Sequence, residues 1–409
     1  MRAFVDFLRS NAPWLAAGFL LTLLSSFGQT FFISIFSGQI RTAFDLSSGQ
    51  WGSLYGAATF TSAMAMLYVG GLADRFRVRQ LGLTVMLLLA LACLVMSRVS
   101  SLAGLAAVIF ALRLTGQGMM SHTAMVAMAR WFVATRGRAV ATASLGFAVG
   151  EAVLPLGFVL LLTRFDWRGL WLLAMALVLA AIPLLLLLLR RERTPQSFAG
   201  ESQATGLQGR DWTRGEVLRH PLFWAMVPAI LAPAMWSTAF FFHQAHIASV
   251  KGWSHLQLVQ LFPLFTVSAV GCLMLSGWLV DRYGAGRVAT LYLLPAALGY
   301  WVLALASSPL SAAPGVMLLG ATQGMNSTVG STFWPEFFGT RHIGKIRSMI
   351  VAVMVLGTAI GPMLSGLLID AGIDFPHQGY GVGLYFIAAA ALAAAGIGRV
   401  RRIAATSGA

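Results

Sequence analysis

Residues 70–79 read GGLADRFRVR, and this charged stretch lies between two apolar runs, 51–69 and 81–99. Charge confined to so few residues between two membrane-length segments indicates a short loop at the water interface. The stretch contains the spacing Gly-x-x-x-Asp-Arg, and the same spacing returns 207 residues later, in 277–282. Because each copy follows the second apolar segment of its own half, the pair predicts an internally duplicated chain.

The composition indicates an integral membrane protein. The chain has 409 residues, of which 58% are hydrophobic and 10% charged, whereas a soluble protein has about 25% charged residues. The formal net charge is +15, which in a soluble protein would suggest a nucleic-acid partner. Here the basic residues lie in short loops between apolar runs, so we expect the lipid bilayer as the partner and no nucleic acid.

The apolar runs predict twelve transmembrane helices, since a spanning helix needs about 20 apolar residues. The arginine-rich segment 190–221 divides them into two six-helix bundles, 1–189 and 222–409, and is expected to be a cytoplasmic linker with one amphipathic turn near 212–218. The predicted fold is therefore all-α and pseudo-symmetric. The predicted spans are 13–36, 50–69, 81–99, 102–130, 138–162, 169–189, 222–243, 255–279, 288–306, 312–336, 346–370 and 380–398.

The distribution of basic residues predicts the orientation in the membrane. Twenty-two of the 28 basic residues lie at the termini and in the even-numbered loops, and five lie on the opposite side. By the positive-inside rule, both termini are expected in the cytoplasm of a cell whose inner membrane the protein crosses many times. No cleavage site follows the first apolar run, so it is expected to remain as a helix. Cys93 and Cys272 fall inside apolar runs, which favours no disulfide or metal site.

The duplicated spacing resembles the signature loop between helices 2 and 3 of the major facilitator superfamily, and its echo between helices 8 and 9. The resemblance implies alternating access around a solute bound near the bilayer midplane between two repeats. It also implies a gating role for one set of residues. These are Gly70, Asp74, Arg75, Gly277, Asp281, Arg282, Glu336 and Arg341.

Further short sequences of the first half recur in the second half. Gln117-Gly118-Met119 in the predicted fourth helix returns as Gln323-Gly324-Met325 in the tenth, at an offset of 206. Leu145-Gly146-x-x-x-Gly150 in the fifth returns as Leu356-Gly357-x-x-x-Gly361 in the eleventh, at an offset of 211. The last glycine is followed by Glu151 in the first half and by Pro362 in the second. Small changes of offset are what loop insertions produce.

Two loops carry a narrower resemblance. Segments 131–139 and 337–347 are similar to the corresponding loops of the monocarboxylate and oxalate–formate branch. That branch implies a small organic anion carried with a proton or by exchange. Members often have a basic residue in helix 8 or helix 11, and segments 257–279 and 348–369 have none. Arg113 would then be the anion partner, or the solute is not a carboxylate.

Arg113 and Glu151 are the principal functional candidates, because charged side chains at membrane depth are costly and mark functional sites. Arg113 is expected to contact an anionic solute, or else to lock helix 4 to a neighbour. A carboxyl group in a low dielectric takes up a proton more readily than in water, so Glu151 is expected to couple transport to protons. A static ion pair with Arg113 is the alternative.

Other polar residues either line a wet cavity or form hydrogen bonds between helices. Trp236, with Phe240 and His243, closes the outer end of a path or packs in the core. His122 is interpreted as packing, because it lies opposite Arg113 on its helix. Glu336 is expected to face Arg282, Arg341 and Arg347 as a gate latch. The candidates for solute binding are Arg113, Trp236, Gln29, Gln117, Gln323 and Asn326.

The sequence favours a transporter over an enzyme. No phosphate loop, zinc motif or nucleophile elbow is present, and we expect no cofactor, no metal and a monomer. The predicted function is secondary active transport of a small organic anion, coupled to protons by symport or exchange. An efflux antiporter for lipophilic or cationic compounds is the alternative, with Glu151 as the cation partner. A membrane enzyme or receptor would require a catalytic constellation or a large soluble domain.

Overall fold

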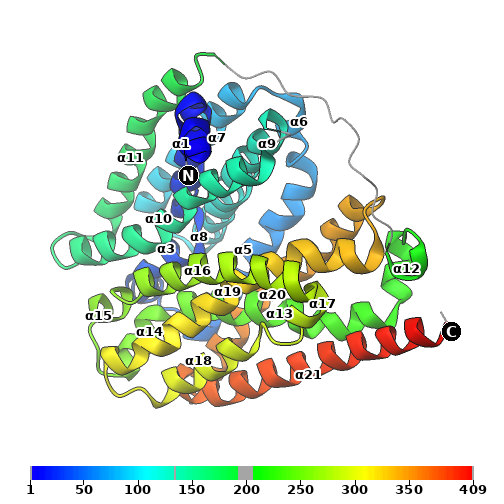
Figure 1. Ribbon diagram of the computed structural model, residues 1–409. Helices are drawn as coiled ribbons and strands as arrows, with labels where there is room; N and C mark the ends of the chain where they lie inside the picture. Colours follow the sequence, from blue (N-terminus) through cyan, green and yellow to red (C-terminus); the bar gives the residue numbers. More distant parts are fainter. Residues whose placement is uncertain (1, 133–134, 192–205, 408–409) are drawn as a thin grey trace. The chain divides into compact units, whose positions relative to one another are not determined.

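The structure is a computed structural model that describes residues 2–132, 135–191 and 206–407. Every regular element in these residues is a helix, which confirms the all-α prediction. The helices form two compact units (Figure 1). The first comprises Met1–Leu46 and Ala57–Gly200, and the second comprises Ser47–Gly56 and Glu201–Ala409. Each unit is described by itself below.

The first span of unit 1 is interrupted. After α1 (Arg2–Ser10), α2 (Ala12–Leu24) gives way to a 3₁₀ turn, η1 (Ser25–Gly28), and the chain bends by 48° before α3 (Thr30–Ile33), η2 (Ser34–Phe36) and α4 (Ser37–Phe44). Gln29 has extended backbone angles, φ −86° and ψ 155°, which end the helical ladder there. Such 3₁₀ segments inside a helix often mark functional hinges.

The rest of unit 1 contains one irregular feature and several regular helices. The fourth span is continuous from α8 through α9, but its middle is a π-helix, η3. Ser101 and Asp166 cap α8 and α11 by accepting backbone N–H bonds from Gly104 and Arg168. The elements are α5 (Ser48–Val69), α6 (Leu72–Arg75), α7 (Val78–Arg98), α8 (Leu102–Leu112), η3 (Arg113–Met120), α9 (Ser121–Trp131), α10 (Arg136–Leu162) and α11 (Trp167–Leu188).

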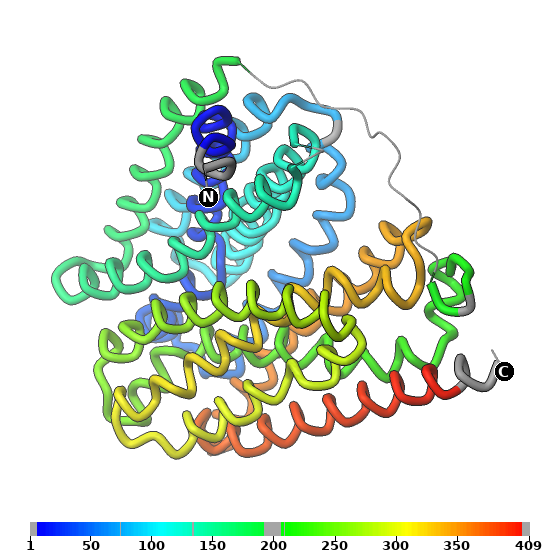
Figure 2. Tube along the Cα trace, viewed as in Figure 1, coloured from blue at the N-terminus to red at the C-terminus, as the bar shows by residue number. Residues whose placement is uncertain are grey.

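Unit 2 contains the remaining helices, and α21 runs unbroken to the end of the described chain (Figure 2). They are η4 (Leu207–Gly209), α12 (Arg214–Arg219), α13 (Pro221–Phe242), α14 (Gln244–Val250), α15 (His255–Val259), α16 (Phe262–Tyr283), α17 (Ala285–Val288), α18 (Leu294–Leu305), α19 (Pro309–Phe338), α20 (Ile343–Asp370) and α21 (Phe375–Ser407).

These elements account for the twelve predicted spans. Within the described residues, eight helices are long and apolar enough to cross a membrane, and the bent first span makes nine. The other three predicted ranges overlap α5, α18 and α19, which are shorter or more polar, and α18 begins at Leu294, six residues later than predicted. Each of the twelve predicted spans therefore corresponds to a helix or to consecutive helices of the structure.

The repeated glycines perform the same packing task in each unit. A Cβ atom on Gly146 would collide with the carbonyl oxygen of Phe19, so α10 lies directly against α2. A Cβ atom on Gly361 would collide with the carbonyl oxygen of Met235, so α20 lies directly against α13. Small residues permit this close approach of helices in a membrane. The sequence repeat thus corresponds to a repeated contact between the first and fifth helices of each half.

The first residues of α5 pack within unit 2. The carboxylate of Asp370 accepts hydrogen bonds from the backbone N–H groups of Ser48 at 3.0 Å and Gly49 at 2.8 Å, and from the Ser47 hydroxyl at 2.6 Å. The Trp51 ring stacks on Phe242 with centroids 5.5 Å apart. An acidic side chain at a helix N-terminus satisfies donors that have no partner in the helix. Helix α5 is therefore shared between the two units.

The described end of the linker is docked on unit 2. The backbone N–H of Trp212 donates to the carbonyl oxygen of Phe338 at 3.1 Å. The rings of Trp212, His220 and Phe338 meet edge to face, with centroids 5.0–5.7 Å apart. The turn expected near 212–218 is the short helix α12, which begins with a capping box of Thr213 and Glu216.

Candidate functional site

Arg113 is the most deeply buried charged side chain in the described residues, with 1% of its surface exposed. Its Nη1 donates to the carbonyl oxygen of Gly28 and to the hydroxyl of Thr30, each at 3.3 Å. Both acceptors lie at the break in the first span, where η1 ends and α3 begins. The broken helix therefore supplies polar backbone to the guanidinium, which an unbroken helix cannot do.

Two glycines bring the break and the π-helix together. A Cβ atom on Gly28 would lie 2.7 Å from the Cα of Gly116 and would collide with the carbonyl oxygen of Leu112. Because π-helical turns commonly occur at functional sites, the contact of two irregular helices around Arg113 makes this region the candidate site of unit 1. Neither irregularity was predicted from the sequence.

Glu151 lies beside the same break. It is 8% exposed and follows Gly150, where an added Cβ atom would collide with the hydroxyl of Ser26 in η1. Arg113 and Glu151 thus belong to two different elements, η3 and α10, that both pack on η1. The region therefore contains a buried cation and a buried carboxyl group, each on an element that packs on η1.

Two of the predicted glutamines, Gln29 and Gln117, lie at the same irregular elements. Gln29 is buried, with 9% of its surface exposed, and forms the extended residue between η1 and α3. Gln117 is half-buried in η3. Its backbone nitrogen would lie 2.8 Å from a Cβ atom on Gly28, so it belongs to the glycine contact described above.

Unit 2 contains the other three predicted solute contacts. Gln323 and Asn326 are half-buried on α19. The side chain of Trp236 on α13 is 6% exposed, and its indole N–H has no hydrogen-bond partner among the described residues. A buried donor without an acceptor is costly in a protein interior. Trp236 therefore retains a hydrogen-bond donor that a ligand could satisfy.

The signature loop of unit 1 is held by the fourth span. The His122 Nε2 lies 3.1 Å from the carbonyl oxygen of Gly70, and Arg130 Nη1 donates to the carbonyl oxygen of Ala73 at 3.1 Å. Arg75 is exposed, and the side chain of Asp74 lies outside the described residues. His122 is therefore a loop anchor as well as a packing residue. A histidine and an arginine eight residues apart near the end of one helix were the available signal.

The second loop is held by a carboxylate. Glu336 accepts hydrogen bonds from the backbone N–H groups of Ala285 at 2.7 Å and Gly286 at 3.4 Å, at the start of α17. In the described part of the chain it forms no ion pair with Arg282 or Arg341. Both arginines are exposed, and the Arg282 guanidinium lies over the rings of Trp278 and Tyr283.

The other two gating candidates of this loop have open surroundings. A Cβ atom added at Gly277 would lie more than 4 Å from every neighbouring atom of the described residues. Asp281 is exposed. Packing within unit 2 therefore does not require a glycine at position 277.

Comparison with known proteins identifies the family. The sequence model described as Major Facilitator Superfamily matches residues 18–362 and 264–405. The chain belongs to the Major Facilitator Superfamily. This transporter is 28% identical over 323 residues to monocarboxylate transporter 13 of Bos taurus, covering 78% of this chain and 73% of the relative. It is 26% identical over 381 residues to monocarboxylate transporter 13 of Rattus norvegicus, covering 90% and 83%.

Solved structures share the fold of this superfamily member. A bacterial homologue of the human lysosomal transporter Spinster matches with a TM-score of 0.65 and 17% identity, covering 97% of this chain and 95% of that one. The nucleoside transporter NupG matches with a TM-score of 0.67 and 14% identity, covering 95% and 98%. At these identities the likeness shows the superfamily fold. The resemblance deduced from the signature loops and from the monocarboxylate-type loops is thus confirmed.

Proposed function

We propose that this protein is a secondary active transporter of a small organic anion, which it moves by alternating access together with a proton, in symport or exchange. Its two relatives described above are named monocarboxylate transporters. Among the described residues, the least exposed charged side chain is a cation within a predicted span, Arg113. The orientation that we propose has both termini in the cytoplasm and the chain in the inner membrane. The observation that carries the proposal is the burial of Arg113 against two irregular helices.

Arg113 acts as the anion contact in this proposal. The two acceptors described above, the Gly28 carbonyl and the Thr30 hydroxyl, are neutral. A charge-assisted bond from a guanidinium to a carboxylate is about twice as strong as a bond to a neutral acceptor. An arriving carboxylate therefore competes well for the guanidinium, and the hydrogen bond to the helix break weakens as the solute binds. Gln29 and Gln117 supply further polar contacts from the same elements.

Glu151 acts as the proton carrier. It is buried on α10, next to the glycine contact with η1. Desolvation favours the protonated form of a carboxyl group, and a nearby cation favours the ionised form. A solute anion that occupies the Arg113 guanidinium would remove part of that second effect, so anion binding and proton uptake reinforce each other. This coupling is the physical basis that we propose for co-transport.

In unit 2, the indole N–H of Trp236 and the amides of Gln323 and Asn326 serve as neutral donors to the solute. The signature loops serve as gates, with Gly70, Asp74 and Arg75 in the first copy. In the second copy, the gating residues are Gly277, Asp281, Arg282, Glu336 and Arg341.

Transport by purified protein in proteoliposomes tests the proposal. We expect uptake of a labelled monocarboxylate to rise with an inward proton gradient, and Arg113→Lys and Arg113→Gln to reduce it at least tenfold. Glu151→Gln should retain exchange but lose the response to the gradient. Arg168→Gln is the matched control, since Arg168 also donates to backbone carbonyls, of Ser97 and Val99, in the same unit.

Two results would reject the proposal. Normal uptake by both Arg113 variants would remove the anion assignment. Transport of lipophilic cations that depends on Glu151 and not on Arg113 would favour the efflux antiporter instead.

A further inference from the structure

The hydroxyl of Ser26 is buried beside the helix break of unit 1. Ser26 is 0% exposed, and its hydroxyl makes no hydrogen bond among the described residues. The adjacent hydroxyl of Ser25 is equally buried but donates to the carbonyl oxygen of Thr22 at 2.6 Å. A buried polar group without a partner costs free energy, and such groups are nearly always paired in native structures. The exception at Ser26 therefore requires an explanation.

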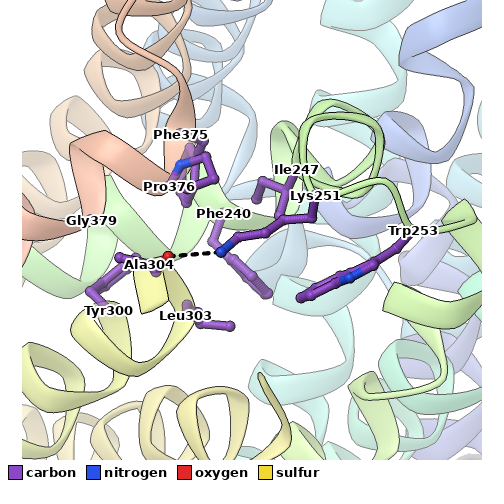
Figure 3. Close-up of a pocket in the computed structure, with 10 residues that line it drawn as sticks. All are labelled: Phe240, Ile247, Lys251, Trp253, Tyr300, Leu303, Ala304, Phe375, Pro376 and Gly379. Atoms are coloured by element: carbon purple, nitrogen blue, oxygen red, sulfur yellow. Dashed lines mark hydrogen bonds between the residues drawn. The ribbon is translucent and has the colours of Figure 1, made fainter. Parts of the chain in front are cut away.

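A polar side chain at a helix end in unit 2 shows the usual arrangement. The ammonium of Lys251, which follows α14, donates to the carbonyl oxygens of Ala304 and Ala306, each at 2.7 Å (Figure 3 shows the first). Lys251 thereby uses the end of α18, where carbonyl groups have no partner inside the helix. Ser26 also lies where a helical ladder ends, but its hydroxyl forms no such bond.

The helix face that carries Glu151 packs on the same break. Phe147 and Phe158 lie four residues before it and seven residues after it, which places all three on one face of α10. Their rings contact Phe31 and Phe27, with centroids 5.6 Å and 6.1 Å apart. The carboxyl group therefore lies on the face that meets η1 and α3, among aromatic rings that have no oxygen or nitrogen to bond with it.

The Ser26 hydroxyl lies where α10 meets η1. A Cβ atom added at Gly150, the residue before Glu151, would collide with the Ser26 hydroxyl. Two backbone acceptors of the break are already in use: the Ser26 carbonyl accepts the N–H of Gln29 at 3.0 Å, and the Gly28 carbonyl accepts from the buried guanidinium at 3.3 Å. The Ser26 hydroxyl oxygen is an acceptor that neither bond uses.

The charged groups around α10 bond elsewhere or lie in its first turn, apart from the buried guanidinium. The elements that pack along α10 are α2, η1, α3, η2, α9 and α11. The first four, all within the described residues 2–132, contain no charged or histidine residue. The charged groups on α9, on α11 and in the first turn of α10 are His122, Arg130, Arg168, Arg136 and Arg138.

Three of these groups bond to backbone carbonyl oxygens away from Glu151. His122 and Arg130 bond to the first signature loop, and Arg168 bonds to the end of α7 and the residue that follows it. Arg113, whose element η3 packs on η1, is therefore the charged group that shares the break with Glu151.

On the basis of the function proposed above, we propose that Ser26 is the positioning residue of the proton carrier: when Glu151 is protonated, its carboxyl O–H donates to the Ser26 hydroxyl oxygen. An ionised carboxylate has no O–H to donate, so this bond stabilises the protonated form alone. The solute anion then occupies Arg113, and the neutral carboxyl group finds its partner in Ser26. Ser26 thus favours the state that carries both proton and solute.

An infrared titration of the full-length protein in lipid vesicles, without solute, tests this assignment. The absorption band of the protonated carboxyl group is assigned to Glu151 by its absence in Glu151→Gln. We expect the midpoint of the titration to lie about 0.5–1 pH unit lower in Ser26→Ala than in wild type, because one hydrogen bond to the protonated form is lost. Ser25→Ala is the matched control and should titrate like wild type, since the Ser25 hydroxyl is bonded to the Thr22 carbonyl.

Two results of this titration would overturn the proposal. One is a midpoint in Ser26→Ala that equals or exceeds that of wild type. The other is the absence from wild type of any band that depends on Glu151, because the carboxyl group would then have no protonated form to pair with Ser26.

Thermal melting at neutral pH separates this role from folding. Ser26→Ala removes only a hydroxyl without a partner, so its melting temperature should equal or exceed that of wild type. Ser25→Ala loses an existing hydrogen bond and should melt at a lower temperature. A lower melting temperature for Ser26→Ala than for Ser25→Ala would show that the Ser26 hydroxyl is structural and would contradict the proposal.

Uptake of labelled pyruvate into proteoliposomes distinguishes the failure of this proposal from the failure of the proposed function. In Ser26→Ala, the pH of half-maximal uptake should fall together with the infrared midpoint. Absence of gradient-driven uptake in wild type would reject the proposed function, and the role of Ser26 with it. Gradient-driven uptake in wild type, with both midpoints unshifted in Ser26→Ala, would reject the role of Ser26 alone.

Discussion

Gly28 and Gly116 meet backbone to backbone: a Cβ atom on Gly116 would lie 2.6 Å from the Cα of Gly28. The contact joins the broken first span to the π-helix of the fourth span, and the guanidinium of Arg113 bonds to the carbonyl of the same Gly28 at 3.3 Å. The position of the buried cation therefore depends on two residues that have no side chain.

Gly116→Ala should destabilise unit 1, because a methyl group would be inserted between two backbones. Overpacking of this kind costs about 1–3 kcal/mol, which we expect to appear as a lower melting temperature in detergent together with loss of anion uptake. Gly169→Ala in α11 is the control, since a Cβ atom there would meet no atom within 4 Å. Equal melting temperatures for the two variants would show that the backbones separate freely.

His122→Ala should loosen the first signature loop, because the bond to the Gly70 carbonyl is lost. We expect faster amide hydrogen exchange in residues 70–76, with the exchange of α10 unchanged. Arg130→Ala should produce the same pattern through the carbonyl of Ala73. Unchanged exchange in both variants would show that the loop is held by other contacts.

Glu336→Gln should weaken the start of α17, because a neutral amide replaces the carboxylate that accepts from Ala285 and Gly286. Loss of a cap costs about 0.5–2 kcal/mol, so the melting temperature should fall. Arg282→Ala should leave stability nearly unchanged, since this arginine is exposed. If the two substitutions were equally destabilising, Glu336 would act through Arg282 rather than through the helix start.

Acidification should weaken the start of α13, which His220 caps. Burial, and secondarily the charge of Arg210, lower the pKa of His220, and its Nδ1 accepts the backbone N–H of Leu222 at 3.1 Å. A folded-state pKa below the unfolded value of 6.5 means that the stabilisation is complete above pH 6.5. It is lost as the pH falls through the folded-state pKa, because the imidazolium cannot accept this bond.

Thermal melting between pH 7.5 and pH 5 measures this effect. His220→Asn keeps an N-cap acceptor without a titrating group, so its melting temperature should depend less on pH than that of wild type. The prediction fails if the two profiles are parallel.

The sequence was sufficient for the fold because its signals were long or repeated. Runs of apolar residues identified the twelve spans, and the glycines at 146 and 150 returned at 357 and 361 with the same packing task. These signals depend on hydropathy, which the bilayer requires of a spanning helix, and on small side chains, which close helix packing requires.

The geometry around the candidate residues could not be predicted in the same way. The backbone break at Gln29 and the π-helix that begins at Arg113 depend on how two helices cross. The local sequence around each of them is compatible with a regular helix. The Glu336 carboxylate was expected to face arginines, but it accepts from backbone N–H groups, which carry no sequence signal. His122 was judged by its angle to Arg113, and that angle does not reveal that the opposite face meets the carbonyl of Gly70.

The cap that Asp370 provides to residues 47–49 has a consequence for dissecting this transporter. Those donors are encoded before the linker, whereas the acceptor is encoded near the end of the chain. A fragment that starts after the linker would therefore lack part of its own core, including the partner of the Phe242 ring. Two co-expressed fragments should assemble only when one of them contains residues 47–56. The division of the sequence at the linker therefore differs from the division of the structure into compact units.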